Sequence, residues 1–383
     1  MTKLEELIKE FCPNGVEYKK IGETLKIERG VRVVKSQLTT QGIYPVYQNS
    51  LTPMGYYDKF NYSAGTAFII GAGSAGEIGY SNIDFWAADD CYCLICNENI
   101  NSRYLYHCLL NNSGYITSKV RKASIPRLSR GVIESLQIPL PALPVQREIV
   151  RILDSFTLYS AELTAELTAR RKQYEFYRDK LLNFGNFVEE RKLEECCNIL
   201  DNKRKPIAQS ARVAGTYPYY GANGIQDYVA EYLFDGEFIL VGEDGSVITE
   251  NGNPIITWAV GKIWVNNHAH IIQSNGKVNF RFLFHYLHII DIKKLVHGNI
   301  PKLTGKDFKE LQIPVPPMDV QERIVKVLDN FDAICSDLGI GLPAEIEKRQ
   351  KQYEYYREKL LTFDGKYATI LTERNGTERN GQG

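Results

Sequence analysis

The sequence predicts a mixed α/β (α+β) fold in which two related globular domains are separated by two long antiparallel coiled-coil helices. One block of sequence occurs twice, at residues 124–156 and again at residues 299–331. A segment rich in Tyr, Gly and Asn precedes each block, and a long segment with helical spacing of its apolar residues follows it. A unit of this length that is present only twice indicates a pseudo-symmetric molecule and not a solenoid.

The repeat is defined by matched residues at fixed offsets. Ile125-Pro126 matches Ile300-Pro301, and Gln146 matches Gln321, in each case 175 positions later (300 − 125 and 321 − 146). A second pair of blocks, 172–178 and 351–357, has an offset of 179 (351 − 172). The second copy therefore carries four extra residues (179 − 175) between its two blocks.

The predicted elements follow one another in a regular order. Residues 1–12 place apolar side chains on one face of a short helix, and residues 16–112 have the short apolar runs and turn signals of a β-rich or α/β domain. A connector with several prolines leads into a long helix from Val145 to about Leu182, whose apolar residues form a coiled-coil seam. Residues 188–287 then repeat the texture of the first domain.

A second long helix is predicted from Val320 to Leu361. Gly339, Gly341 and Pro343 interrupt it at the place of the four extra residues, so we expect a kink or short loop there. The resulting segments are a first globular domain with its short helix (1–144), a first spacer helix (145–184), a second globular domain (185–318), a second spacer helix (319–363) and a polar, disordered tail (364–383).

Composition restricts the class of protein. Lys plus Arg (46) equals Asp plus Glu (46), so any anionic partner has to be met by local patches of positive charge. The chain contains no run of 18 apolar residues and no signal-peptide core, and we expect a soluble, cytoplasmic protein with no membrane partner. Eight scattered cysteines in 383 residues fit a reducing compartment.

Motifs for catalysis are missing from the sequence. There is no Gly-x-x-x-x-Gly-Lys-Ser/Thr phosphate loop and no Asn/Asp-Pro-Pro-Tyr/Phe motif of the kind that amino-methyltransferases use. Gly71-Ala72-Gly73 with Gly76 partly matches a dinucleotide fingerprint, but no helical pattern follows it, which favours a tight turn. No acid, base and nucleophile converge, so we predict no catalytic residue.

Two groups of residues are of metal-binding type. The Cys-x-Cys-x-x-Cys run at 91–96 has His107 and Cys108 downstream, which is poor spacing for zinc, and cysteines on an apolar strand behave as small hydrophobic residues. His268 and His270 share a strand face with no carboxylate in register, which favours a structural or hydrogen-bonding role. We therefore predict no metal site.

Basic residues gather beside both copies of the repeated block although the total charge is zero. Lys and Arg contact phosphates, while Asn, Gln, Ser and Tyr on loops can contact base edges, so paired basic clusters beside divergent domains favour binding of DNA. Together with two matched loop positions, the clusters give these candidate DNA-binding residues: Ser74, Lys119, Arg121, Lys122, Arg127, Gly245, Ser246, Lys293, Lys294, Asn299 and Lys302.

The repeated blocks carry a resemblance to a known family. The segments SIPRL and NIPKL, then LQIPLPALPVQREIV and LQIPVPPMDVQERIV, then helices ending KQYEFYRDKLL and KQYEYYREKLL, resemble the specificity subunit of type I restriction-modification systems. The pattern covers the chain to about Phe363. The second domain also contains a strand typical of that family's target-recognition domains, Trp264 to His270, whereas the first domain departs from it.

This resemblance implies a non-catalytic subunit. Each domain would read one half of a split, asymmetric site in double-stranded DNA, and the helices would set the gap and dock two methyltransferase subunits. Those subunits would methylate adenine at N6 with S-adenosylmethionine, restriction subunits would use ATP and Mg²⁺, and this chain would hold no cofactor itself. The seam residues assigned to spacing and docking are Gln146, Ile149, Leu153, Phe156, Tyr174, Tyr177, Gln321, Ile324, Leu328, Phe331, Tyr353 and Tyr356.

Two other functions are compatible with the residues. A stand-alone bipartite DNA-binding regulator could use the same helices and domains, and association with a methyltransferase would distinguish the two. A structural coiled-coil scaffold whose domains bind protein would show no salt-dependent affinity for DNA.

Overall fold

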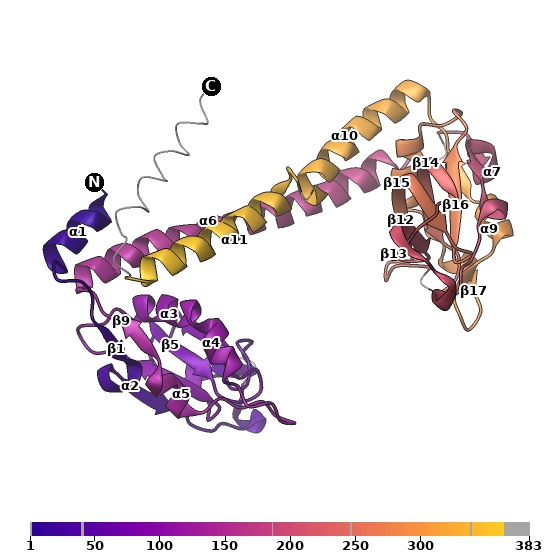
Figure 1. Cartoon of the computed structure of the whole chain (residues 1–383). Coiled ribbons are helices and arrows are strands. Elements are labelled where there is room, and N and C mark those ends of the chain that lie inside the picture. The colour runs from indigo at the N-terminus through magenta and orange to yellow at the C-terminus, as the bar shows by residue number, and fades with distance from the viewer. Residues whose placement is uncertain (1, 40–41, 186, 246, 338, 364–383) are drawn as a thin grey trace. The chain divides into compact units, whose positions relative to one another are not determined.

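The computed structural model describes residues 2–39, 42–185, 187–245, 247–337 and 339–363. They belong to two compact units, Met1–Thr164 with Glu345–Gly383, and Ala165–Ala344 (Figure 1). Each unit contains one globular head together with parts of the long helices. The predicted segments treated the helices as separate from the heads, whereas here helix residues such as Leu153 and Leu328 belong to the head cores. The predicted tail, 364–383, lies outside the described residues.

The first head is a mixed structure, as predicted. Its N-terminal helix α1 (Lys3–Phe11) begins at a capping box in which the Thr2 side chain accepts a hydrogen bond from the Glu5 backbone. Two sheets follow, with strand orders β2-β8-β5-β6 and β4-β3-β7. The strands are β2 (Lys26–Arg29), β3 (Tyr44–Tyr47), β4 (Gly55–Tyr57), β5 (Thr66–Ile70), β6 (Ile78–Ser81), β7 (Trp86–Ala87) and β8 (Cys91–Ile95).

The second head has one larger sheet, in the order β11-β16-β14-β15-β12-β13. Its strands are β11 (Cys197–Ile199), β12 (Ala214–Gly221), β13 (Gly224–Val229), β14 (Phe234–Gly242), β15 (Ile256–Val265) and β16 (Ala269–Ser274). The single strand β15 takes the places of β6 and β7, so one sheet in the second head corresponds to two in the first. Among these pairs β12–β15 is parallel, as is β3–β7.

Strand pairing confirms the sequence match between the heads. Val46 pairs with Trp86 in the first head, and Tyr219 pairs with Trp264 in the second, in the same parallel register. Trp86 donates its indole N–H to the Val31 carbonyl, in the segment after β2, and Trp264 donates its indole N–H to the Lys205 carbonyl, in the segment after β11.

The matched Gln-Ile-Pro segments form short strands that close each head. β9 (Gln137–Pro139) pairs antiparallel with β1 (Tyr18–Lys20), and β19 (Gln312–Pro314) pairs antiparallel with β10 (Glu190–Lys192). Each pair brings the two ends of a head together, immediately before a long helix. The short helices beside them are α2 (Ile21–Thr24) and α5 (Arg130–Ser135) in the first head, and α7 (Leu193–Cys196) and α9 (Gly305–Lys309) in the second.

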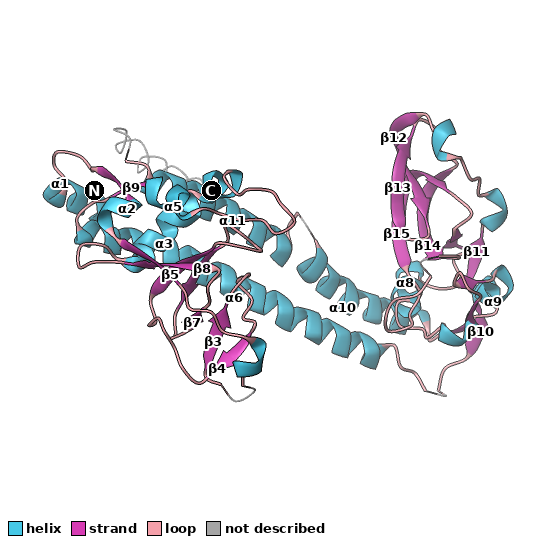
Figure 2. Cartoon of the chain, turned by 90° about the horizontal axis from the view of Figure 1, so that it is seen from below, coloured by secondary structure: helices cyan, strands magenta, loops and turns pink. Residues whose placement is uncertain are grey.

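One helix in each head lies between its sheet and the long helices (Figure 2). This helix is α3 (Ser102–Asn111) in the first head, where the short helix α4 (Ser113–Ser118) follows it, and α8 (Phe280–Leu287) in the second head. The core of the first unit joins the sheet residues Ala67 and Ile69 with Tyr104 of α3 and Ile149 of a long helix. The second core joins Ile239, Phe282 and Ile324 in the same way.

The long helices are α6 (Leu143–Leu181), α10 (Met318–Ser336) and α11 (Leu342–Leu361). α6 has 39 residues, with its one proline in the first turn, so it spans roughly 58 Å at about 1.5 Å per residue. The predicted second helix is divided into α10 and α11, which confirms the expected interruption. None of the helices in the described part of the chain combines the length and apolar character needed to cross a bilayer.

Candidate nucleic-acid interface

A loop and an Ile-Pro segment are held together by backbone hydrogen bonds in the first head. The Gly73 N–H donates to the Pro126 carbonyl at 3.2 Å, and the Leu128 N–H donates to the Gly71 carbonyl at 2.9 Å. The second head repeats both bonds. We call this pair of segments the clamp: residues 71–74 with 125–128 in the first head, and residues 243–245 with 300–303 in the second.

The clamp of the second head has the same geometry. The Gly245 N–H donates to the Pro301 carbonyl at 3.0 Å, and the Leu303 N–H donates to the Glu243 carbonyl at 2.8 Å. Gly73 and Gly245 have φ values of +86° and +78°, in the left-handed region that favours glycine. A Cβ on Gly73 would also lie 2.7 Å from the Asn49 carbonyl oxygen, so this tight turn requires glycine there. The turn, not a dinucleotide loop, is therefore the structure of the glycine-rich segment.

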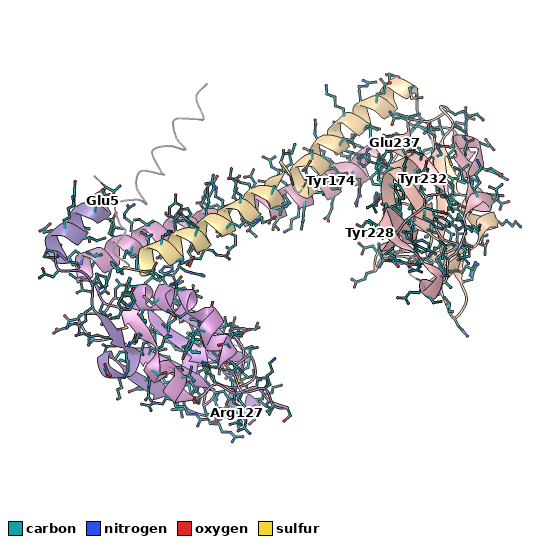
Figure 3. The ribbon with its side chains drawn as sticks, viewed as in Figure 1. Glu5, Arg127, Tyr174, Tyr228, Tyr232 and Glu237 are labelled. Carbon is teal, nitrogen blue, oxygen red and sulfur yellow. The ribbon has the colours of Figure 1, made fainter. Side chains whose placement is uncertain are left out.

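The first clamp brings the predicted basic residues of its head together. Arg121 and Arg127 form an isolated antiparallel bridge, with backbone N to O distances of 2.8 Å and 3.2 Å. Lys119, Arg121, Lys122 and Arg127 are exposed, and Ser74 is half-buried in the loop that they flank. Arg127 lies at the periphery of the first head (Figure 3). Arg121 and Arg127 therefore lie at the clamp, where Arg127 also bridges to Ala72, and Lys119 and Lys122 are exposed next to Arg121 in the chain.

The second clamp holds only part of its predicted set. Gly245 and Lys302 lie in the clamp, and Asn299 is exposed in the loop between β17 (Val296–His297) and β18 (Lys302–Leu303). Lys293 and Lys294 are exposed on a 3₁₀ helix, Lys293–Leu295, directly before β17, where the Lys293 side chain lies over Gly252. Ser246 lies outside the described residues.

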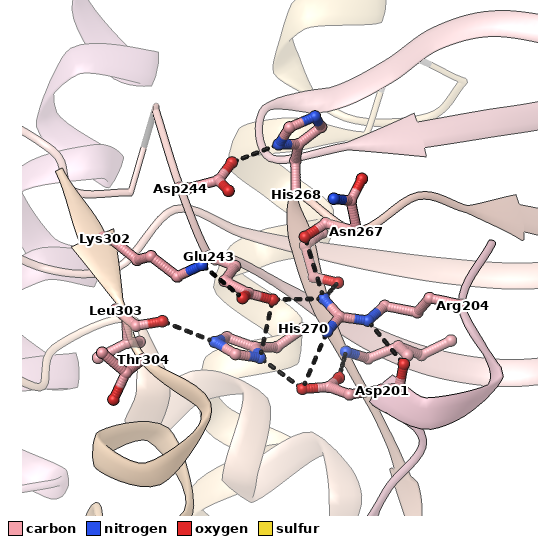
Figure 4. Close-up of polar contacts among 12 residues, drawn as sticks. Asp201, Arg204, Glu243, Asp244, Asn267, His268, His270, Lys302, Leu303 and Thr304 are labelled. Atoms are coloured by element: carbon pink, nitrogen blue, oxygen red, sulfur yellow. Dashed lines mark hydrogen bonds and ion pairs between the residues drawn. The ribbon is translucent and has the colours of Figure 1, made fainter. Parts of the chain in front are cut away.

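Beneath the second clamp lies a charged network that the sequence did not predict (Figure 4). Arg204 is its centre: its Nη1 atom lies 2.6 Å from Glu243 Oε2 and donates to the Ala269 carbonyl at 2.7 Å. Lys302 Nζ lies 3.3 Å from Glu243 Oε1, so the clamp lysine is tied to the same carboxylate.

His270 completes this network. Its Nδ1 atom lies 2.6 Å from Asp201 Oδ2, and its Nε2 atom lies 3.0 Å from the Leu303 carbonyl. Both ring nitrogens therefore have an oxygen partner within hydrogen-bond distance. Burial raises the pKa of Asp201, but the hydrogen bond from His270 and the neighbouring cations outweigh it and leave the pKa below its usual value.

Asp201, Glu243 and His270 place three possible ligand atoms within 4.8 Å of one another. Arg204 and Lys302 already neutralise the carboxylates, and both nitrogens of His270 face hydrogen-bond acceptors. A cation at this point would meet two positive side chains. The cluster is therefore an ion-pair network that supports the clamp. The hydrogen-bonding role predicted for His270 fits these contacts, but the expectation of no carboxylate beside the two histidines is wrong, because Asp201 and Asp244 come from other parts of the head.

A cavity of about 380 Å³ opens beside the second clamp. His268 hydrogen-bonds to Asp244 at its rim, and Asn266 donates to the Gln226 side chain at 3.2 Å. The cavity lining is mainly polar or backbone: Ala222, Asn223, Gln226, Asp244, Gly245, His268 and Ile300. Amides and an imidazole at the mouth of a cavity can donate to and accept from base edges.

The first head places different side chains at the corresponding points. The clamp hydrogen bonds put Gly71 at the position of Glu243, and strand pairing puts Tyr92 at that of His270. The indole hydrogen bonds put Gly30 at the position of Arg204, and a Cβ on Gly30 would lie 2.2 Å from the Ala88 carbonyl oxygen. The backbone of the clamp is thus common to the heads, while the side chains around it differ. The His-x-His pattern was the only sequence signal of the network.

The seam residues lie in the packing of the long helices within each unit. Ile149 and Leu153 are fully buried in the first core, and Ile324 and Leu328 are buried in the second. In the first unit Phe156 stacks on Tyr356 with ring centroids 5.3 Å apart. In the second, Tyr177 stacks on Phe331 at 5.8 Å and Tyr174 contacts the same ring. These contacts support the spacer role; docking of another subunit by the same residues stays a prediction.

Each unit also has an Arg–His–Asp joint between its head and a long helix. In the first unit, Asp154 accepts from Arg103 Nε at 3.0 Å and lies 2.8 Å from His107 Nε2, while Tyr353 hydroxyl lies 3.2 Å from His107 Nδ1. Burial lowers the pKa of His107, so a neutral ring that donates to Asp154 and accepts from Tyr353 fits the geometry. No pattern in the sequence predicted this joint.

The second unit repeats the joint with one difference. Arg281 and His285 lie 2.6 Å and 2.7 Å from Asp329 Oδ1, with Asp332 beside them. Among the described residues none hydrogen-bonds to His285 Nδ1. His285, Asp329 and Asp332 could together approach a cation, but Arg281 already lies against both carboxylates.

The cysteine-rich segment forms core. Cys91 and Cys93 are buried in β8, where burial raises the pKa of the Cys91 thiol to about 12 and also raises that of Cys93. His107 and Cys108 lie on α3 and face other partners. Within the described residues, the candidate metal clusters contain no cysteine. The apolar role predicted for the cysteines fits this packing.

Comparison with known proteins identifies the family. The family described as "Type I restriction modification DNA specificity domain" matches residues 13–170 and again residues 187–348. The chain belongs to this family. Its role is that of a DNA specificity subunit in a type I restriction-modification complex, and the stand-alone regulator is not favoured.

Individual relatives cover different shares of the chain. A putative type I restriction enzyme specificity subunit of Haemophilus influenzae is 48% identical over 193 residues, and this match spans about half of each chain (49% and 49%). The EcoR124I/EcoR124II specificity subunit of Escherichia coli is 27% identical over 362 residues, which is 85% of this chain and 83% of that one.

A solved structure has the same fold. The type I restriction-modification S subunit from M. genitalium superposes with a TM-score of 0.64 at 19% identity, over 91% of this chain and 96% of that one. This likeness confirms the predicted architecture of two repeated domains and coiled-coil helices.

Proposed function

We propose that each head of this specificity subunit reads one half of a bipartite, asymmetric DNA site through the side chains around its clamp. The observation that carries the proposal is the recurrence of the clamp in both heads with different surroundings. The backbone hydrogen bonds of Gly73 and Gly245 are the same, whereas Gly71 and Tyr92 stand where the second head has Glu243 and His270. A common backbone would place the heads alike on the duplex, and the variable side chains would select different bases.

The exposed basic residues of the clamps would contact phosphates. Arg121 and Arg127 in the first head, and Lys302 in the second, are exposed beside loops that carry polar groups. Contacts to phosphate supply affinity without sequence preference, so the two functions would be divided within each head. Two linked heads gain affinity together only where both half-sites lie at a matching distance.

We extend the proposal to the partner subunits. Two methyltransferase subunits would dock on the paired helical regions and transfer a methyl group from S-adenosylmethionine to N6 of adenine. Restriction subunits would join with ATP and Mg²⁺, and this chain would hold no cofactor. The Arg–His–Asp joints at Asp154 and Asp329 support a pair of docking positions because they occur once in each unit.

The test compares two single charge removals in the complete complex with its methyltransferase subunits. The recognised site is first obtained by mapping methylated adenines in a host genome. Arg127→Ala removes a clamp cation, and Lys26→Ala removes an exposed lysine at the end of β2 that pairs with Ile95, away from the clamp. We expect Arg127→Ala to remove about one phosphate contact. The slope of log affinity against log salt concentration should then become shallower by about 0.9, while the preferred sequence stays the same.

Lys26→Ala should leave both affinity and slope at the level of the unmodified complex. Equal behaviour of the two variants would show that the clamp surface does not face DNA. Absence of any methylated, bipartite site in the genome map would reject the proposed reading mechanism as a whole.

A further inference from the structure

Two exposed isoleucines occupy the same position in the two clamps. Ile125 is 54% exposed and Ile300 is 69% exposed, and each directly precedes the clamp proline. Single exposed apolar residues are common on protein surfaces. Here both isoleucines belong to the matched Ile-Pro segments of the repeat, yet unlike the following Leu128 and Leu303, which are buried, they stay exposed in both heads.

The backbone holds both isoleucines in place. Each lies in the turn of a short hairpin, closed by the Arg121–Arg127 bridge in the first head and by the His297–Lys302 pair in the second. The following proline restricts the isoleucine to extended conformations, and the proline carbonyl accepts the clamp hydrogen bond from glycine. Both side chains are thus presented from a fixed support.

The neighbours of the isoleucines are polar or charged. Exposed cations flank them, Arg121 and Lys122 before Ile125, and Lys302 after Ile300. Neither isoleucine belongs to a hydrophobic cluster among the described residues. Ile300 is the one large apolar side chain in the lining of the 380 Å³ cavity, beside Asn223, Gln226 and His268.

We propose that Ile125 and Ile300 are the apolar base contacts of the two heads, each buried against DNA when its half-site is bound. This inference rests on the proposed function. Phosphate contacts by the flanking cations would place the tip of the hairpin in a groove of the duplex. There the isoleucine could contact one of two kinds of apolar surface. One is the methyl group of thymine in the major groove, and the other is a base step that opens to admit the side chain.

The test uses the complete complex and duplexes that contain the site mapped by methylation. Ile125→Ala and Ile300→Ala are compared with Ile83→Ala and Val260→Ala, which truncate side chains that are 56% and 61% exposed. Ile83 follows β6, and Val260 pairs with Glu237 in mid-sheet, so neither lies at a clamp. We expect each clamp variant to lose about tenfold in affinity for the specific duplex. Affinity for non-specific DNA and the salt slope should not change, and the control variants should match the unmodified complex.

Two further measurements distinguish the sources of apolar surface. Deoxyuridine in place of each thymine identifies a methyl contact if one replacement weakens the unmodified complex but not the alanine variant. 2-Aminopurine at each step identifies an opened step if its fluorescence rises with the unmodified complex and not with the variant. Ile125→Val should retain most of the affinity, and urea denaturation verifies that each variant is folded.

The outcomes separate this inference from the proposed function. Loss of specific affinity with either signature supports the base contact. Clamp variants equal to the controls, equal losses on specific and non-specific DNA, or a loss with neither signature would overturn it. If the unmodified complex itself shows no salt-dependent binding to the mapped duplex, the proposed function fails instead.

Discussion

At the residue scale, one buried glutamine connects each head to the helix that follows it. Gln146 accepts a hydrogen bond from the Asn101 N–H at 2.8 Å and donates to the Pro141 carbonyl at 2.8 Å. Gln321 accepts from the Asn279 N–H at 2.8 Å and donates to the Pro316 carbonyl at 2.7 Å. Since Asn101 and Asn279 cap α3 and α8, each glutamine ties the start of a head helix to the start of a long helix. This explains why the glutamine recurs in the sequence repeat.

Replacing either glutamine should destabilise its own unit. Gln146→Ala or Gln321→Ala leaves a buried backbone N–H and a buried carbonyl without their partner, and we expect each change to lower the free energy of unfolding by about 1–3 kcal/mol. Chemical denaturation of the purified chain measures the loss. Gln173→Ala, at an exposed position of α6, is the matched control and should change stability little. Equal effects at all three positions would contradict the connecting role.

The second prediction concerns acid stability of the second unit. Burial lowers the pKa of His288 to about 4, helped by the neighbouring charges of His285, Arg178 and Arg281. The unfolded chain takes up this proton near pH 6.5, so the stabilisation is complete above that value and is lost as the pH falls towards about 4. The loss should amount to about 3 kcal/mol at most.

Urea unfolding between pH 7.5 and pH 4.5 checks this expectation. His288→Gln, which cannot take up the proton, should flatten the pH dependence of unfolding in this range. His297→Gln alters an exposed histidine of the same unit and serves as control. An unchanged pH profile in His288→Gln would assign the acid lability to other groups, such as His285, whose pKa burial also lowers.

At the element scale, the break between α10 and α11 has a local cause. The Asp337 carboxylate accepts hydrogen bonds from the N–H groups of Gly339 at 2.6 Å and Ile340 at 3.0 Å, which turns the chain out of the helix. Pro343 then lies in the first turn of α11, where its missing N–H costs nothing. The four extra residues of the second copy thus form a connection between two helices, while α6 runs without a break.

Lengthening the helices should change the gap between half-sites before it changes either half-site. We consider four residues inserted in α6 between Thr164 and Ala165, and four in the connection at 337–341. Four residues that continue the helix of α6 add roughly 6 Å, or about two base pairs of B-DNA, and the four in the connection let the second copy follow this change in length. We expect the mapped methylation site to keep both halves and to widen its gap by about one or two base pairs.

The same four residues added within the tail, 364–383, are the control and should leave the site unaltered. A gap that stays constant after the helix insertions would reject the helices as the element that sets spacing.

At the scale of the whole molecule, each unit takes helical segments from both sides of a head. In the second unit, the end of α6 precedes the head and α10 follows it. In the first unit, α11 corresponds to the end of α6, and the start of α6 corresponds to α10. Tyr353 of α11 and Tyr174 of α6 correspond, since the former contacts His107 and the latter lies among the Asp329–Asp332 charges. The last helix of the chain, α11, therefore packs at the Arg–His–Asp joint of the first unit, as the part of α6 around Tyr174 packs at the joint of the second.

Exchange of one head should alter one half of the recognised sequence. We expect a chain whose residues 188–298 come from another member of the family to methylate sites with one new half and one original half. The reciprocal exchange of residues 16–112 is the matched control and should change the other half. The readout is again the genome-wide map of methylated adenine, and a change in both halves after a single exchange would show that the heads do not read independently.

Much of the architecture followed from the sequence. The repeated block predicted the two heads, the seam predicted the paired helices, and Gly339, Gly341 and Pro343 predicted the break in the second helix. These features are local or periodic, and local geometry at a proline or glycine is determined by few neighbouring residues. The DNA-binding candidates near the clamps also came from sequence, because exposed Lys and Arg beside the repeat needed no knowledge of the fold.

The tertiary structure alone decided which distant residues meet. Arg204, Glu243 and His270 come from three separate parts of the second head, and their contact depends on the order and register of strands in the sheet. The same holds for His107 and Tyr353, which lie 246 positions apart. Periodicity specifies the face of an element that is buried, but not the element that covers it. The sequence by itself therefore determined the repeated plan of this protein, and only long-range packing determined the charged network and the joints that support its clamps.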